Sequence, residues 1–173
     1  MKKLDIKEIT VSAVVATIYV VLTWTTGSLS FGPIQFRIAE ALVLLCFFNK
    51  KYFIPLVLGC IISNIFSPYG VIDVVLGATA TAVALVGIMF SKNIIIASLF
   101  PVLSNGLIVG LEITLMEGVF SFPTFLLNFS TVALGEFVCV SIAGVLLFTI
   151  LRKNDKFMEL IDANQNIENK QDN

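Results

Sequence analysis

The chain has 173 residues, of which 57% are hydrophobic and 13% are charged, with a formal net charge of −1. Its mean hydropathy of +0.96 lies far from that of a soluble domain, so we interpret it as an integral membrane protein. The sequence contains no histidine, and Cys46, Cys60 and Cys139 stand singly in apolar runs. This composition argues against histidine-dependent catalysis, zinc knuckles and CxxC redox pairs. We therefore expect no catalytic residue, metal, cofactor or nucleic-acid partner.

Four stretches approach or exceed the length of about 20 apolar residues that a membrane-spanning helix needs. They cover roughly residues 9–30, 71–91, 94–116 and 122–151. Two shorter runs, 37–48 and 52–67, are expected to be tilted, extended by neighbouring residues or partly buried in protein. We predict an all-α membrane protein with six transmembrane helices in residues 1–151. A cytoplasmic tail, 152–173, is expected to begin as a helical extension carrying Phe157 and Ile161 and to be disordered for most of its length.

The basic residues predict how the chain is oriented, because cytoplasmic flanks of membrane helices are enriched in lysine and arginine. In a six-helix arrangement, ten of the eleven basic residues fall on one side: Lys2, Lys3, Lys7, Lys50, Lys51, Lys92, Arg152, Lys153, Lys156 and Lys170. The loops "TGSLSFGPIQ", "SPYG" and "EGVFSFP" on the other side contain none. We expect a multi-pass protein with both termini in the cytoplasm. Arg37 is the single exception.

Several acidic residues lie within or beside the apolar segments, towards the outer side. They are Glu40, Asp73, Glu112, Glu117 and Glu136. With Arg37 their formal charge is +1 − 5 = −4. Since each such group costs several kcal/mol in a dry bilayer, the sequence predicts a water-filled cavity or a bound positive group.

These charged residues also have simpler interpretations. Arg37 and Glu40 are three residues apart and would satisfy each other on one helical face. Glu117 is expected in a solvated loop, and Asp73 can cap a helix or lie at the membrane interface. Glu112 and Glu136 have no basic neighbour in the sequence.

Buried amides accompany the carboxylates in the same half of the protein. Amides alone can hold membrane helices together, but amides combined with carboxylates indicate a pocket for a polar, hydrogen-bonding and cationic small molecule. The predicted binding residues are Arg37, Glu40, Asn64, Asp73, Asn105, Glu112, Asn128 and Glu136. Aromatic residues at this level, such as Tyr69, are expected mostly in an interfacial belt, and one or two can stack on a flat ligand.

Small residues repeat along the first predicted helix. Ser12 and Ala16, and likewise Ala13 and Thr17, are spaced by four residues, which lets another helix approach closely. This strip indicates either a partner contact or packing within the chain.

The stretch 36–84 contains three distinctive motifs, "FRIAEAL", "GCIISNIFSPYG" and "DVVLGATAT". They resemble the S components of energy-coupling factor (ECF) transporters, and within them the queuosine-precursor transporter (QueT) family. The resemblance extends over nearly the whole chain. It implies a six-helix capture subunit of the bacterial plasma membrane that works with a transmembrane coupling protein and two cytoplasmic ATPases. The strip at Ser12 and Ala16 resembles the family's AxxxA first helix, which contacts the coupling protein, with serine in place of one alanine.

The substrate implied by this resemblance is 7-aminomethyl-7-deazaguanine or a related deazapurine. No GxxxxGK[ST] motif occurs, so energy has to come from partners or an ion gradient, and the chain is not expected to be an enzyme. Three alternatives remain open: an S component for a different vitamin-like substrate, a small proton-coupled transporter of an organic cation, and a membrane enzyme with an unspecified metal.

Overall fold

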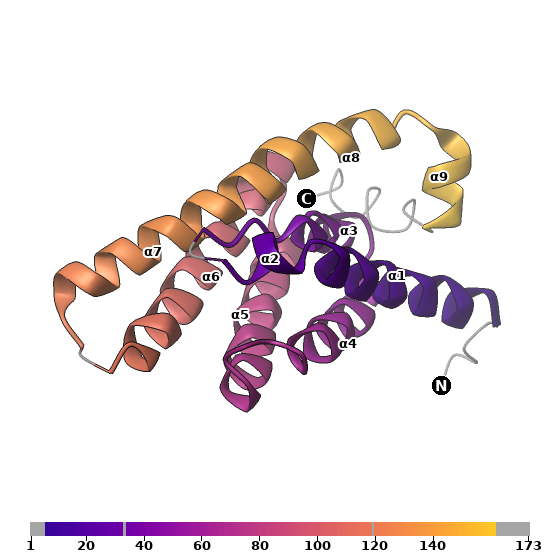
Figure 1. The fold of residues 1–173 in the computed structure, drawn as a ribbon. Coiled ribbons are helices and arrows are strands. Elements are labelled where there is room, and N and C mark those ends of the chain that lie inside the picture. Colours follow the sequence, from indigo (N-terminus) through magenta and orange to yellow (C-terminus); the bar gives the residue numbers. More distant parts are fainter. Residues whose placement is uncertain (1–5, 33, 119, 162–173) are drawn as a thin grey trace.

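The computed structural model describes residues 6–32, 34–118 and 120–161, and its regular elements there are all helical (Figure 1). In chain order they are α1 (Ile6–Thr25), α2 (Gly27–Ser30), η1 (Ile38–Leu44), α3 (Leu45–Phe48), η2 (Lys50–Tyr52), α4 (Phe53–Asn64), α5 (Val71–Phe90), α6 (Ile94–Met116), α7 (Phe122–Glu136), η3 (Phe137–Gly144), α8 (Val145–Leu151) and α9 (Asp155–Leu160). Segments η1 and η2 are 3₁₀-helical, and η3 is a π-helical stretch between α7 and α8.

Four helical segments are long and apolar enough to cross a membrane. They are Ile6–Thr25, Val71–Phe90, Ile94–Met116 and the joined α7, η3 and α8 over Phe122–Leu151. The last three coincide with the predicted 71–91, 94–116 and 122–151, whereas the first ends at Thr25, five residues before the end of the predicted 9–30. They carry exposed apolar side chains, such as Val71 and Phe90 on α5, which suit contact with lipid rather than water. The chain is therefore a multi-pass membrane protein.

The short run at residues 38–48 forms the centre of the bundle rather than part of its surface. Here η1 and α3 are largely buried, and η1 contacts α1, α4, α5, α6 and η3. A helix inside protein has no need to match the bilayer thickness, so the expectation that this run is partly buried in protein is confirmed. Helix α4 has 12 residues, or about 18 Å. The count of six crossings stays a prediction, because these two segments are short.

The helices pack in a simple order. Helix α1 lies against α4, α4 against α5, α5 against α6, and α6 against α7. Because α5 and α6 are joined by only three residues, 91–93, the start of α5 and the end of α6 lie at the same end of the bundle. We call this the distal end. Figure 1 shows the α6–α7 turn on the left, opposite the first turn of α1 and helix α9 on the right.

The end opposite the distal end has an aromatic core. The rings of Phe48 and Phe148 stack at a centroid distance of 5.6 Å, and Phe157 of α9 lies 6.3 Å from Phe148. Ile161 is buried, and the amide of Asn49 donates a hydrogen bond to its carbonyl oxygen at 3.4 Å. Helix α9 thus packs onto the membrane-spanning part. The disorder predicted for the rest of the tail concerns residues 162–173, which lie outside the described residues.

Candidate ligand-binding site

Arg37 lies at the centre of a buried polar cluster. Its side chain is 2% exposed, and its guanidinium carbon is 5.6 Å from the centre of the Phe31 ring. Its Nε and Nη2 atoms have no hydrogen-bond partner. Its positive charge interacts electrostatically with four buried carboxylates from four different elements: Glu40, Asp73, Glu112 and Glu136. One cation therefore serves four acids.

Glu40 accepts its hydrogen bonds from neighbouring helices and none from Arg37. Its Oε1 accepts hydrogen bonds from the Tyr19 hydroxyl of α1 and from the Thr81 hydroxyl of α5 at 3.3 Å. Its Oε2 has no partner. Within the described residues, Arg37 and Glu40 form no hydrogen bond with each other, so the interpretation of the two as a mutually satisfied pair is not supported.

Glu136 has a similar arrangement on the other side of the cluster. Its Oε1 accepts a hydrogen bond of 3.0 Å from the amide of Asn105 on α6, and its Oε2 has no partner. It is the last residue of α7, directly before the π-helical segment η3. The preceding residue, Gly135, faces the backbone of Gln35, so the absence of a side chain there allows the segment before Arg37 to approach α7. We call Glu40 and Glu136 the central pair.

Asp73 and Glu112 differ from the central pair because their carboxylate groups accept no hydrogen bond. Each is 1% exposed, and all four of their carboxylate oxygens lack a partner. They stand on adjacent helices at the distal end, and the charge of Asp73 acts on Glu112. Tyr69, in the α4–α5 connection, is half-buried beside them: burial raises its pKa first, and the charges of Asp73 and Glu112 add to this effect. We call Asp73 and Glu112 the distal pair.

The three predicted amides have different positions. Asn105 belongs to the cluster through Glu136, and Asn64 belongs to it by donating to the backbone oxygen of Asp73 at 3.0 Å. Asn128 instead donates to Thr114 at 3.1 Å and to the exposed Glu117 at 3.3 Å, tying α7 to the end of α6. These contacts place Asn128 outside the cluster, and its assignment as a binding residue stays a prediction. Seven of the eight predicted binding residues are thus brought together.

Three further residues belong to the cluster and were not predicted from the sequence. Gln35 is 3% exposed and its Nε2 has no partner. Tyr19 and Thr81 hold Glu40. For Tyr19 and Thr81 the only signal in the sequence is a hydroxyl group within an otherwise apolar segment, and such hydroxyls more often bond to their own helix backbone.

The unsatisfied atoms of the cluster are dominated by acceptors. Eight oxygen atoms and three nitrogen atoms of the cluster have no hydrogen-bond partner. The oxygens are Glu40 Oε2, Asn64 Oδ1, Asp73 Oδ1 and Oδ2, Asn105 Oδ1, Glu112 Oε1 and Oε2, and Glu136 Oε2, and the nitrogens are Gln35 Nε2 and Arg37 Nε and Nη2. Buried polar atoms in folded proteins almost always have a partner. This arrangement therefore fits a cationic ligand that is rich in hydrogen-bond donors. Within the described part of the chain, no group of three or more acidic, cysteine or histidine side chains is placed to hold a metal.

The small-residue strip of α1 borders two surface grooves. Ser12, Ala13 and Ala16 line a groove of about 390 Å³ between α1 and α4, with Glu8 and Lys51 also at its border. Ala13 and Thr17 line a second groove, of about 410 Å³, on the exposed face of α1. The backbone of Ala16 is also close to Gly59 of α4. The strip therefore combines internal packing on one side with a free surface on the other.

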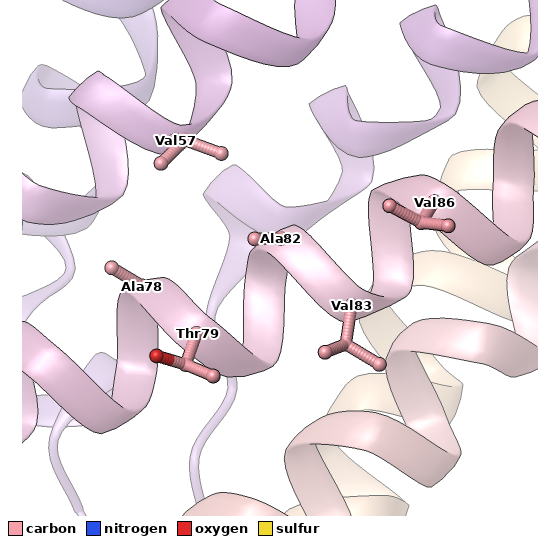
Figure 2. Close-up of a pocket in the computed structure, with 6 residues that line it drawn as sticks. All are labelled: Val57, Ala78, Thr79, Ala82, Val83 and Val86. Atoms are coloured by element: carbon pink, nitrogen blue, oxygen red, sulfur yellow. The ribbon is translucent and has the colours of Figure 1, made fainter.

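A further groove of about 470 Å³ lies between α4 and α5 (Figure 2). Figure 2 shows Val57 of α4 on one side, and Ala78, Thr79, Ala82, Val83 and Val86 of α5 on the other. None of these six side chains carries a charge. This surface suits lipid or a helix and does not suit a polar ligand.

Comparisons with known proteins point to one family. The model of the family described as "QueT transporter" matches residues 9–153. The chain is also similar to a protein of Lactococcus lactis subsp. cremoris (strain MG1363) named "Queuosine precursor transporter QueT", with 34% identity over 172 residues, covering 90% of this chain and 98% of that protein. No solved structure gives a significant match. The matched region contains every residue of the polar cluster.

Proposed function

Because this chain belongs to the QueT transporter family, we propose that it is the substrate-capture (S) subunit of an ECF-type importer and binds a queuosine precursor from outside the cell. The observation that carries this proposal is the set of buried, unpartnered polar atoms around Arg37. A transporter needs such a site to replace the water that its substrate leaves behind, whereas a purely structural cluster would satisfy its own hydrogen bonds.

The chemistry of the cluster suits 7-aminomethyl-7-deazaguanine. This compound has a cationic aminomethyl group and a guanine-like ring with several N–H donors, and it offers few acceptors. Its donors match the excess of oxygens in the cluster, and its ring carbonyl suits Arg37 or Gln35, whose nitrogens are free. A neutral ligand that mainly accepts hydrogen bonds would leave the carboxylates uncompensated.

The proposed topology has six membrane crossings, both termini in the cytoplasm and the distal end facing outwards. Support comes from the basic residues, since Lys92 lies at the opposite end to the exposed Glu117. Cysteines substituted at these two positions test it in intact cells. A membrane-impermeant maleimide should label Glu117→Cys before lysis and Lys92→Cys only after it, and the reverse pattern would invert the topology.

The proposed partners are a transmembrane coupling protein and two cytoplasmic ATPases, with α1 as the contact surface. The grooves along Ser12, Ala13, Ala16 and Thr17 support this assignment, because small side chains let a partner helix approach closely. Uptake by reconstituted vesicles should require the ATPase subunits and resist an uncoupler while ATP is held constant. Uptake without them that collapses with the proton gradient would instead indicate a proton-coupled transporter.

Direct identification of the ligand tests the function itself. The chain, purified in detergent from cells supplied with the precursor, should carry a deazaguanine that mass spectrometry of the extracted small molecules detects. Isothermal titration of the ligand-free protein should then show stoichiometric binding of 7-aminomethyl-7-deazaguanine. A chain that is folded and binds no deazaguanine would overturn the proposed substrate.

A further inference from the structure

The four carboxylates of the cluster lie at two depths. On α5, Thr81, which holds Glu40, follows Asp73 by eight residues, or about 12 Å along the helix. On α6, Asn105, which holds Glu136, precedes Glu112 by seven residues, or about 10 Å. Because α5 and α6 run in opposite directions, both offsets point from the distal end towards the middle of the bundle. Two helices thus independently place the central pair deeper than the distal pair.

The two pairs also differ in what their oxygens bind. Glu40 and Glu136 each have one oxygen fixed by protein donors and one oxygen free. A carboxylate held in this way presents its free oxygen in a fixed direction, which suits a directional N–H group on a rigid ring. Asp73 and Glu112 have four free oxygens and no protein donor, so their main unmet requirement is positive charge.

We propose, building on the function proposed above, that Asp73 and Glu112 form the subsite for the ligand's ammonium group, while the central pair binds the N–H edge of its ring. The ligand then lies with its amine towards the distal end and its ring towards the middle of the bundle. The distal pair determines specificity for a cationic substituent.

A primary ammonium meets the requirements of the distal pair. It has three donors and a unit positive charge, and hydrogen bonds between ionised groups are the strong ones. Arg37 alone cannot neutralise four acids, and its charge already acts on all of them. Tyr69 is half-buried and packs against the buried apolar cluster that includes Val109 and Ile113 of α6. The carboxylates of Asp73 and Glu112 act electrostatically on its hydroxyl, so an aromatic ring lies near this subsite, as in many sites for organic cations.

Two ligands that differ only in this substituent separate the subsites. The 7-aminomethyl compound is cationic, whereas the 7-cyano analogue has the same ring and no charge. Titration calorimetry on the purified chain would compare both ligands on the wild type, Asp73→Asn, Glu112→Gln and Glu136→Gln. Gel filtration and thermal unfolding in detergent show which variants are folded. Asn and Gln preserve side-chain size, remove the charge and replace one acceptor oxygen by an NH2 donor.

We expect Asp73→Asn and Glu112→Gln to weaken binding of the aminomethyl compound by at least about 30-fold and to leave that of the cyano analogue nearly unchanged. Glu136→Gln should lower the affinity for both ligands by a similar factor. If Asp73→Asn and Glu112→Gln lower the affinity for both ligands equally, or lower it for neither ligand, the ammonium assignment is wrong although the proposed substrate stands. If the wild type binds neither ligand, the proposed substrate and the assignment fail together.

Discussion

The contact between Gly135 and Gln35 offers a sharp test of how the site is built. A Cβ atom placed on Gly135 would lie 2.7 Å from the carbonyl carbon of Gln35. Carbon atoms that are not bonded normally stay about 3.5 to 4.0 Å apart, so Gly135→Ala requires a shift of about 1 Å. The two atoms nearest the new methyl group are the carbonyl oxygen and carbonyl carbon of Gln35. Both belong to the backbone, which cannot rotate away as a side chain would. The segment leading to Arg37 therefore has to move.

The expected size of the effect follows from this displacement. Forcing an extra methyl group into a packed site typically costs about 1 to 3 kcal/mol. Arg37 is two residues from Gln35, and Glu136 directly follows the substituted position, so the strain falls on groups that bind the ligand. If the bound state needs the close approach, ligand affinity should fall by about 5- to 150-fold.

The assay is titration of 7-aminomethyl-7-deazaguanine into purified Gly135→Ala, together with thermal unfolding in detergent. Gly27→Ala is the matched control, because a Cβ there meets no atom within 4 Å. The control should behave as the wild type, while Gly135→Ala should lose affinity and melt at a lower temperature. Wild-type affinity and stability in Gly135→Ala would refute the idea that this contact positions Arg37.

Three further substitutions test separate parts of the structure. Tyr19→Phe removes a donor from the buried Glu40 and should lower the free energy of unfolding in detergent by about 1.5 to 3 kcal/mol; an unchanged value would show that the hydroxyl is dispensable. The double variant Arg37→Glu with Glu40→Arg should lose ligand binding, because the Tyr19 hydroxyl would then face a cation, and retained binding would restore the simple ion-pair interpretation. Ala13→Leu should abolish ATP-dependent uptake while ligand binding survives, with Val21→Leu, another exposed position of α1, as the control. Loss of binding in Ala13→Leu would assign the strip to internal packing.

The long membrane segments could be predicted from the sequence because their signal is compositional. A run of 20 apolar residues has few soluble alternatives, and the predicted 71–91, 94–116 and 122–151 agree closely with Val71–Phe90, Ile94–Met116 and Phe122–Leu151. The surroundings of the two short segments could not be predicted, because the length of a segment alone does not show whether lipid or protein surrounds it. Only the packing of η1 against α1, α5 and η3 resolves this for residues 38–48.

The charged residues of the polar cluster could be predicted because a charge in an apolar segment is costly and therefore rare. Their partners could not, since a spacing rule assumes a regular helix. Arg37 and Glu40 are three residues apart, but Arg37 precedes η1 with φ of −87° and ψ of 84°, which is not a helical conformation. Its side chain is thus not directed along the helix face that Glu40 shares. The bond from Tyr19 to Glu40 joins residues 21 apart, and no local pattern predicts it.

The charge balance explains why this cluster would be unfavourable without a ligand. Glu117 is exposed and does not count towards the buried charge. Arg37 and the four buried carboxylates therefore have a formal net charge of +1 − 4 = −3 when all are ionised. Protein donors reach only the central pair, and they stabilise one oxygen of each carboxylate without adding charge. A cationic ligand adds the missing positive charge where the protein supplies no donor, and its ring adds N–H groups where one oxygen remains free. Binding and the completion of the buried core are then the same event, which is what a capture subunit requires.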